Sequence, residues 1–455
     1  MPEIDFTLRD FCHPVAIARL GRSFAHHLSL PHAAWQEWRD ERLRETVAAA
    51  ARCPFWRERF AAAGVAPAEI RTAADLRRLP VLRKEEVRAG GTALHAADAS
   101  RHAARPAFTS GTTGNPVPFL IDRHARVLEF VYYWRHWGQA GYRLGQRFAQ
   151  LNAQHFLRRG WRERVAHWQP HLRRLMLNSA ALRRGNAHEF IAAMRAHKVR
   201  FLKGLASPLF WLADLVGERG LEAPRLVALF STGENLVPAR RARIEAVFGA
   251  RVLDSYGLLE QAASISECPA GGYHVNSDYA LHEFAPTEWR TPDGAPLHAI
   301  LGTTLHNRSM PLLRYDVGDL VELAGPDAPC RCGGTLPLVR AVHGRTEDAV
   351  LTPDGRCVTA LFVVPDEVPG VAGVQFLQDE PLHLRIRVVP TAEFDAGRER
   401  EFVAWAQALV GPALRITLER VGADALVRGP TGKVPLVLSV VPRARAVAGG
   451  SEHAP

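Results

Sequence analysis

Short apolar runs alternate with helical stretches through the middle of this 455-residue chain. The runs RFLKGL, LVALFST and RVLDSYG are typical of β-strands. Residues from roughly Ala125 to Gly138 and from Asn186 to His197 have the spacing of helices. Strands and helices in alternation favour an α/β fold built on a mostly parallel sheet.

The regions on either side follow other patterns. Residues from about Leu30 to Gly90 look helical, with a glycine stop at Gly64. A second helix is predicted near Thr72, where a capping threonine precedes an acidic residue. From Tyr279 to Glu322, short strands with proline and glycine turns predict a small β region.

The residues after Gly344 indicate a separate unit. Strands such as VAGVQFLQ and LHLRIRVVP, a helix at REREFVAWAQALVG and a strand ending in a PTGK loop predict a compact α+β domain. We therefore expect a large N-terminal α/β domain of several subdomains, residues 1–343, and a small mobile α+β domain, residues 344–455.

Composition is ordinary for a soluble globular protein, with 47% hydrophobic and 23% charged residues. There is no long uncharged apolar stretch, and the N-terminus starts acidic. We therefore expect a cytoplasmic protein with neither a membrane span nor a signal peptide. The sequence leaves open whether the chain forms a homodimer.

The net charge of +10 comes almost entirely from arginine, because only Lys84, Lys198, Lys203 and Lys433 are lysines. We interpret the arginines as scattered along the chain, whereas a nucleic-acid binder would gather them into a patch. We therefore expect no nucleic-acid partner. The positive field would still attract a polyanionic ligand such as ATP or coenzyme A.

The segment FTSGTTGNP, from Phe108, carries the clearest chemistry. Glycines such as Gly111 and Gly114 let backbone N–H groups approach the oxygens of a polyphosphate. Ser110, Thr112 and Thr113 add hydroxyl groups that can contact phosphates or a metal ion. The segment lacks the Gly-Lys-Ser/Thr ending of a P-loop. The alternative is a solvated turn rich in serine, threonine and glycine.

This segment resembles the signature of the adenylate-forming superfamily of acyl-CoA synthetases, luciferases and nonribosomal peptide adenylation domains. Within that superfamily the chain is most similar to the phenylacetate–coenzyme A ligase family and its capsule-biosynthesis-type relatives. The amino-terminal pattern CPFWRERFAAAGVAPAEIRTAADLRRLPVLRKEEVR also resembles that family. The resemblance runs from about Trp35 to Val437, with the motifs in the family's order.

Two motifs follow apolar strands. In STGENL the resemblance implies that Gly233, Glu234 and Asn235 form one side of an adenine pocket. An ordinary strand-to-helix turn is the alternative. In DSYGLLEQA it implies that Tyr256, followed by Gly257, is the platform under adenine and that Glu260 holds Mg²⁺. Many relatives have Thr or Ser where this chain has Leu259. The alternative is a core tyrosine and a surface glutamate.

Three later motifs complete the comparison. In LLRYDVGDL, Asp319 suits the paired hydroxyls of a ribose, although a turn aspartate is a common role. In GRTED the resemblance implies that Arg345 reaches ribose or phosphate and that Glu347 is the domain pivot, where relatives usually have Asp or Lys. In PTGK it implies that Lys433 is the catalytic lysine, whose ammonium neutralises charge on the α-phosphate.

A Cys/His set forms a separate candidate site. Cys268, His274, Cys330 and Cys332 supply four soft ligands from two loops, which fits a closed tetrahedral Zn²⁺ site. Four protein ligands leave no open position, so we expect structural rather than catalytic zinc. Some relatives show a similar set. The alternative is reduced buried cysteines and a hydrogen-bonded histidine.

Together these motifs predict ATP-dependent activation of a carboxylic acid to an acyl-AMP, with coenzyme A as the second substrate by resemblance. Transfer to an amine or a carrier protein, and a nucleotide-binding relative without catalysis, are the alternatives. The acyl pocket is least defined. Candidates are Tyr132, Tyr133, Trp134 and Trp137, with residues 204–208, and aromatic side chains would suit an aryl or other hydrophobic acid. Aromatics at this spacing are more often plain core.

Overall fold

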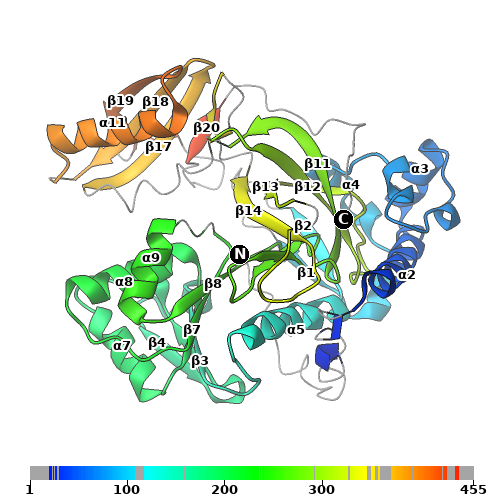
Figure 1. Cartoon of the computed structure of the whole chain (residues 1–455), viewed down its shortest axis with the longest axis horizontal. Helices are drawn as coiled ribbons and strands as arrows, with labels where there is room; N and C mark the ends of the chain where they lie inside the picture. Colours follow the sequence, from blue (N-terminus) through cyan, green and yellow to red (C-terminus); the bar gives the residue numbers. More distant parts are fainter. Residues whose placement is uncertain are drawn as a thin grey trace.

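The computed structural model describes most of the chain: residues 20–22, 24, 26–27, 30–108, 117–157, 159–234, 236, 238–291, 293–325, 328–345, 350–353, 357–358, 370–391, 393–422, 424–427 and 436–439. Figure 1 shows a large α/β body and a smaller unit formed by the carboxy-terminal part of the sequence, coloured orange to red. Within the described residues, every helix is too short or too polar to cross a lipid bilayer.

The amino-terminal region is helical, as predicted. Its elements are α2 (His32–Ala50), α3 (Pro54–Ala62) and α4 (Lys84–Gly90), with 3₁₀ turns η1 (Pro67–Glu69), η2 (Asp75–Arg78), η3 (Gly91–Leu94) and η4 (Ala99–His102). Helix α3 stops just before Gly64, whose φ of +62° suits the left-handed turn that follows the helix.

The helix predicted near Thr72 is only a four-residue 3₁₀ turn, η2. One carboxylate oxygen of Asp75 accepts hydrogen bonds from the backbone N–H groups of Arg71 and Thr72 and from the Thr72 hydroxyl, at 2.9–3.0 Å. These local bonds close a tight turn in place of the hydrogen bonds of a longer helix.

Parallel strands form the centre of the molecule. The strands are β3 (Phe148–Leu151), β4 (Ala166–Gln169), β5 (Arg174–Leu177), β6 (Phe201–Gly204), β7 (Ala228–Thr232) and β8 (Arg251–Gly257). They lie in the order β8-β7-β6-β3-β5, all parallel, with β4 antiparallel at the edge. The predicted strands β6 to β8 are confirmed.

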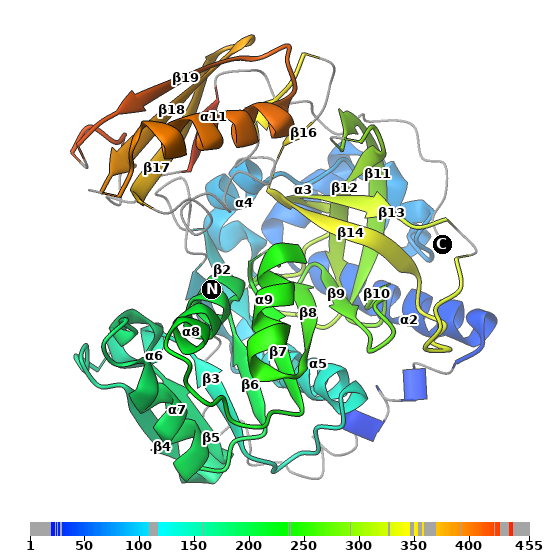
Figure 2. The same ribbon diagram turned by 60° about the vertical axis from the view of Figure 1, so that its left-hand side comes forward.

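Helices cover both faces of this parallel part. They are α5 (Arg123–Gln139), α6 (Gln154–Leu157), α7 (Ala187–Ala196), α8 (Ala206–Glu218) and α9 (Pro238–Phe248), with short turns η5 (Pro170–Leu172) and η6 (Ser179–Ala181). Side chains of α7, α8 and α9 share one apolar cluster with one face of the strands. Trp137 of α5 packs with Phe148, Phe201 and Phe230 on the other face. Figure 2 shows α7, α8 and α9 running along the strands.

The predicted β region extends the same sheet. Its strands are β9 (Ser264–Glu267), β10 (Tyr273–Val275), β11 (Ala280–Arg290), β12 (Pro296–Thr304), β13 (Tyr315–Leu323) and β14 (Leu338–Arg345). They are antiparallel, and β9 pairs with β8, so all twelve strands form one sheet. Strand β8 therefore belongs both to the parallel part and to the β region. A separate hairpin joins β1 (Arg105–Phe108) and β2 (Pro118–Ile121).

The carboxy-terminal unit has its own core. It contains β15 (Val350–Leu351), β16 (Cys357–Val358), β17 (Val371–Glu380), β18 (His383–Pro390), α11 (Ala396–Val410), β19 (Arg415–Arg420) and β20 (Val437–Ser439). Four of these strands form a sheet in the order β19-β18-β17-β20, and α11 packs its Phe402 and Ala406 on it. The expected α/β class is confirmed, while the division at residues 343 and 344 stays a prediction.

Candidate functional site

Three of the predicted motifs meet at one edge of the sheet. Strands β6, β7 and β8 are parallel neighbours that end at Gly204, Thr232 and Gly257. Their register places Gly204 beside Ser231 and Thr232 beside Ser255. Open α/β sheets bind ligands at the carboxyl ends of their parallel strands, so this edge is the expected place for a small-molecule site.

Gly233 and Glu234 leave β7 at this edge. Gly233 has a φ of +76°, a backbone conformation that strains any residue with a side chain. The hydroxyl of Ser255 donates a hydrogen bond of 3.0 Å to the carbonyl oxygen of Ser231, which holds β8 to β7 just before the chain turns. Glu234 is half-buried. Asn235, the third predicted residue of this motif, lies outside the described residues.

Tyr256 and Asp319 are in direct contact. The Tyr256 hydroxyl donates a hydrogen bond of 2.7 Å to Oδ2 of Asp319, which joins β8 to β13 across 63 positions of the sequence. Asp319 is buried and Tyr256 is half-buried. In the β13–β14 ladder, Arg345 is the residue directly opposite Asp319. Only the backbone of Arg345 is described. The residues predicted for adenine, ribose and phosphate are therefore neighbours.

Glu260 lies in the buried turn that follows β8. The side chain before it, Leu259, packs in an apolar cluster with residues of α2, α3 and β2. The turn is pressed against β12, where a Cβ on Gly302 would lie 2.0 Å from the carbonyl oxygen of Ala262. Leu259 is therefore a core residue, which accounts for the absence of a hydroxyl at this position.

Most of the predicted phosphate loop, Ser110 to Gly114, lies outside the described residues, as do Glu347 and Lys433. The strands at the two ends of the loop are described, and Phe108 pairs with Pro118 across the β1–β2 hairpin. Val117, at the end of the loop, is buried in the same apolar cluster as Leu259. The residue that follows the loop therefore lies in the same core cluster as the residue before Glu260.

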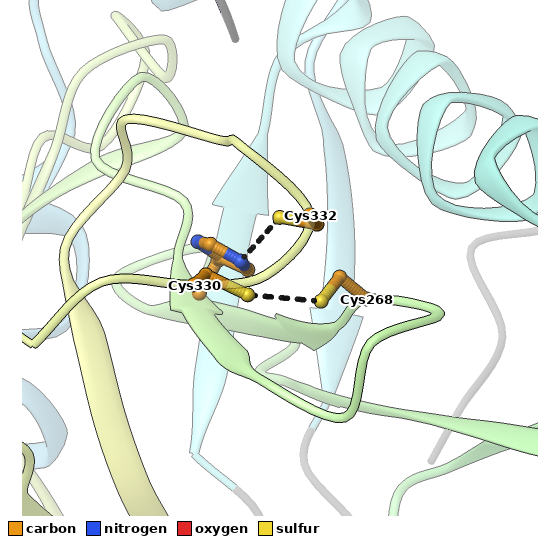
Figure 3. Close-up of side chains that lie close together, drawn as sticks. Cys268, Cys330 and Cys332 are labelled. Atoms are coloured by element: carbon orange, nitrogen blue, oxygen red, sulfur yellow. Dashed lines mark hydrogen bonds between the residues drawn. The ribbon is translucent and has the colours of Figure 1, made fainter.

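The four predicted metal ligands come together. The Sγ atoms of Cys268 and Cys330 are 3.4 Å apart, and Sγ of Cys332 is 3.2 Å from Nε2 of His274. All four ligand atoms lie within 4.8 Å of one another. Figure 3 shows the three cysteines converging from two loops. Ligands at zinc–sulfur distances of ~2.3 Å on a tetrahedron are about 3.8 Å apart, so this spacing fits one Zn²⁺ ion.

The surroundings of the cluster also suit a metal. Nδ1–H of His274 donates to the carbonyl oxygen of Leu336 at 3.1 Å, which leaves Nε2 as the ligand atom. Burial lowers the pKa of His274 and so favours the neutral imidazole that metals need. A Cβ on Gly272 would lie 2.7 Å from Sγ of Cys330. Gly272 therefore leaves space that the cluster uses.

The candidate acyl-pocket aromatics divide into two groups. Tyr132 and Trp137 are buried, and the ring of Trp137 stacks on Phe230 with centroids 5.0 Å apart, so both are core residues. Tyr133 and Trp134 are only half-buried. The sequence analysis missed Glu129 and Lys203 beside them. Two signals were available in the sequence. Glu129 is the one acidic residue inside the apolar stretch RVLEFVYYW, and Lys203, one of only four lysines, lies inside a predicted strand.

The arginines are less scattered than we interpreted from the sequence. Residues 141–184 contain ten arginines and one glutamate, which is nine of the ten net positive charges of the chain. This segment forms β3, β4, β5 and their connections at one end of the sheet. The expectation that no nucleic acid binds therefore cannot rest on dispersed charge. It stays a prediction, as does the cytoplasmic location, and a homodimer stays an open possibility.

No protein-family model matches the chain. Among curated proteins it is similar to phenylacetate-coenzyme A ligase of Thermus thermophilus, with 24% identity over 351 residues that cover 75% of this chain and 76% of the relative. It is also similar to protein CapK of Staphylococcus aureus, with 20% identity over 292 residues and 63% of each protein. A solved structure of 2-hydroxyisobutyryl-CoA ligase in the postadenylation state, in complex with R3-HIB-AMP, matches 91% of both chains with a TM-score of 0.66 and 20% identity.

The chain is similar in sequence and in fold to members of the adenylate-forming superfamily. The resemblance that the motifs indicated is therefore confirmed. The same 2-hydroxyisobutyryl-CoA ligase matches with a TM-score of 0.58 in an open conformation and 0.57 in the thioesterification state. At 20–21% identity these solved structures establish the adenylate-forming fold, and the roles of individual site residues are a matter for proposal.

Proposed function

We propose that the chain activates a carboxylic acid with ATP to an acyl-AMP and then transfers the acyl group to coenzyme A. One observation carries this proposal. The 2.7 Å contact between Tyr256 and Asp319 lies beside the ends of β7 and β8, where Gly233 and Glu234 also lie. An aromatic ring for adenine and a carboxylate for the ribose hydroxyls are therefore paired at the ligand-binding edge of the sheet.

The comparisons support the same reaction. One curated relative is named a phenylacetate-coenzyme A ligase. The solved 2-hydroxyisobutyryl-CoA ligase is described with an acyl-AMP and with coenzyme A. For this chain we propose the same two co-substrates, ATP and coenzyme A.

In the first step a carboxylate oxygen of the acid attacks the α-phosphorus of ATP, and the bond to pyrophosphate breaks. Both reactants are anions, so positioning and charge neutralisation must lower the barrier. We assign the β- and γ-phosphates to the backbone N–H groups and hydroxyls of Ser110 to Gly114. The buried carboxylate of Glu260 would hold Mg²⁺, which supplies further neutralisation of phosphate charge. Lys433 would place its ammonium on the α-phosphate.

In the second step the thiol sulfur of coenzyme A attacks the acyl carbonyl carbon, the bond to AMP breaks and a thioester forms. We propose that the carboxy-terminal unit turns about Glu347 between the steps, which withdraws Lys433 and admits the thiol. The relative supports such a motion, because 2-hydroxyisobutyryl-CoA ligase is described in postadenylation, open and thioesterification states. The half-buried rings of Tyr133 and Trp134 would suit an aryl or other hydrophobic part of the acid.

Replacement of the proposed catalytic lysine tests this function. Lys433→Ala should reduce acid-dependent exchange of labelled pyrophosphate into ATP at least ~100-fold, because one preorganised charge contributes that much to a transition state of this kind. Binding of ATP measured by calorimetry should change little. Lys198→Ala, an exposed lysine between α7 and β6, is the matched control and should retain full exchange. Undiminished exchange in Lys433→Ala would refute the assignment.

We further propose that Cys268, His274, Cys330 and Cys332 hold one structural Zn²⁺. The ion would join the turn after β9 to the loop before β14, and so stabilise the β region that positions Asp319. Metal analysis should find about one zinc per chain. Cys332→Ser should lose that zinc and lower the unfolding temperature. Protein purified without any zinc but with unchanged stability would refute this site.

A further inference from the structure

Helix α5 keeps one stripe of its surface only half-buried. Glu129, Phe130, Tyr133 and Trp134 are partly accessible, although Leu128, Val131 and Tyr132 between them are buried. Positions four apart lie on the same face of a helix, so the stripe is continuous. A helix face that simply packed into the core would be covered along its length. Tyr133 of this stripe faces Lys203 of β6, so the stripe lies on a side of α5 that faces the sheet.

The face of the sheet opposite this stripe carries both aromatic and polar side chains. It presents Phe148 and Phe201, at the starts of β3 and β6, and Phe230, in the middle of β7, against Trp137. Two residues beyond Phe201 the same face carries Lys203, whose register neighbours are Gln150 on β3 and Phe230 on β7. Nζ of Lys203 lies 3.8 Å from the ring centroid of Tyr133 and 5.7 Å from that of Trp137. Lys203 and Gln150 are therefore polar groups directly beside the aromatic side chains of this face.

Glu129 connects this stripe to the proposed catalytic turn. The hydroxyl of Tyr279 donates a short hydrogen bond to Glu129. Nε2 of Gln261 lies 3.5 Å from Oε2 of Glu129 and donates a stronger bond of 3.0 Å to the carbonyl oxygen of Ala125. Gln261 directly follows Glu260 in the sequence. A carboxylate on α5 is therefore linked to the turn that we assign to Mg²⁺.

A pocket for a purely apolar acid would be destabilised by the charges of Glu129 and Lys203. Placing a carboxylate and an ammonium away from water costs several kcal/mol for each ion unless partners compensate. Burial raises the pKa of Glu129, and the Tyr279 hydrogen bond and the charge of Lys203 oppose that rise. Both residues are half-buried, so each keeps some accessible surface.

We propose that Lys203 and Glu129 form a polar subsite for the acyl group, so that the preferred acid carries a hydroxyl group in addition to its reacting carboxyl. A hydroxyl can accept from the Lys203 ammonium and donate to the Glu129 carboxylate at once. A second carboxylate would be repelled by Glu129, and an amino group would be repelled by Lys203. This subsite would define the class of acid that the proposed reaction uses, so the inference rests on the proposed function.

Matched acids in the pyrophosphate exchange assay test the subsite. The pairs are phenylacetate with 4-hydroxyphenylacetate and pentanoate with 5-hydroxypentanoate, and 4-carboxyphenylacetate and 5-aminopentanoate carry the charged groups. Wild-type protein should favour the hydroxylated member of at least one pair by ~10- to 100-fold in kcat/KM, as hydrogen bonds to charged groups imply. Lys203→Met and Glu129→Gln should each reduce this preference at least fivefold, mainly through KM.

Matched controls separate recognition from folding. Lys198→Met and Glu189→Gln remove the same charges from exposed positions and should keep the preference. If Glu129→Gln does not fold, Tyr279→Phe removes only the hydroxyl that holds the carboxylate and should weaken the preference too. A purely structural role for the pair would lower the unfolding temperature of the variants without changing which acid they favour.

Two negative results have different meanings. Wild-type exchange that favours the unsubstituted acids, or a preference that survives both substitutions, would overturn the subsite and leave the adenylation reaction standing. Wild-type protein that exchanges pyrophosphate with none of the six acids, nor with a wider panel of carboxylic acids, would overturn the proposed function and the subsite together.

Discussion

Removal of the Tyr256 hydroxyl should weaken nucleotide binding without unfolding the protein. Tyr256→Phe keeps the ring and deletes the 2.7 Å hydrogen bond to Asp319. A hydrogen bond to a charged group contributes about 1.5–3 kcal/mol, which corresponds to a loss of roughly 10- to 100-fold in affinity. Because Asp319 is buried, the lost donor is not freely replaced by water and the carboxylate becomes poorly oriented for a ribose.

Two further variants separate orientation from stacking. Tyr256→Ala removes the ring as well, and base–aromatic stacking adds about 1–3 kcal/mol to the loss. Asp319→Asn removes the charged acceptor. In the double variant Tyr256→Phe/Asp319→Asn the losses should not add, because both substitutions break the same contact.

Calorimetric titration with AMP and with ATP and magnesium measures these losses independently of the acid substrate. Thermal unfolding checks that each variant is folded. Gln139→Ala, at the exposed end of α5, is a control that should bind nucleotide like the wild type. If Tyr256→Phe and Asp319→Asn both bind AMP with wild-type affinity, the two residues do not form the nucleotide site and our placement of it is refuted.

Three other predictions concern the metal cluster and two buried groups. Gly272→Ala places a Cβ 2.7 Å from Sγ of Cys330 and should lower bound zinc well below one per chain. Gly325→Ala, whose Cβ would have no atom within 4 Å, should keep its zinc. Equal zinc in the two variants would contradict the geometry. Burial lowers the pKa of His136 to about 4, so its folded form resists protonation and stability is lost as pH falls below 6.5. Urea unfolding should show about 2 kcal/mol less stability at pH 5 than at pH 7.5 from this residue, and His136→Gln should lose that part of the slope. Burial first, and then the charge of Glu267, raises the pKa of Asp254 to about 6, so the folded state loses stability as pH rises from 3.8 to 6. Asp254→Asn should therefore stabilise the protein by up to about 3 kcal/mol at pH 8 relative to its effect at pH 4, and an equal effect at both values would contradict this reasoning.

Short-range patterns were enough to place many elements. The helices from Arg123 and from Ala187, and the strands that end at Gly204, Thr232 and Gly257, are where the periodicity predicted them. Each depends mainly on residues within one helix or strand, whose apolar side chains repeat with the period of that element. The helix near Thr72 was wrong because a single side chain, Asp75, closes a tight turn.

The motifs also located the chemistry along the chain, but not in space. Nothing in the sequence brings Tyr256 to Asp319, 63 positions away, or Cys268 to Cys330, 62 positions away. The antiparallel register of β8 to β14 makes those contacts. In the sequence, Leu259 is only a departure from the family pattern. The structure shows that it packs in the apolar cluster.

The sequence by itself therefore determined which residue types are available and which local elements carry them, because side-chain periodicity and loop signatures are properties of neighbouring residues. Only the tertiary structure decided that Lys203 of β6 lies over Tyr133 of α5 and that Glu129 reaches Tyr279. Contacts between residues so far apart depend on how α5 packs across the sheet, and burial then raises the pKa of Glu129 and of Tyr279.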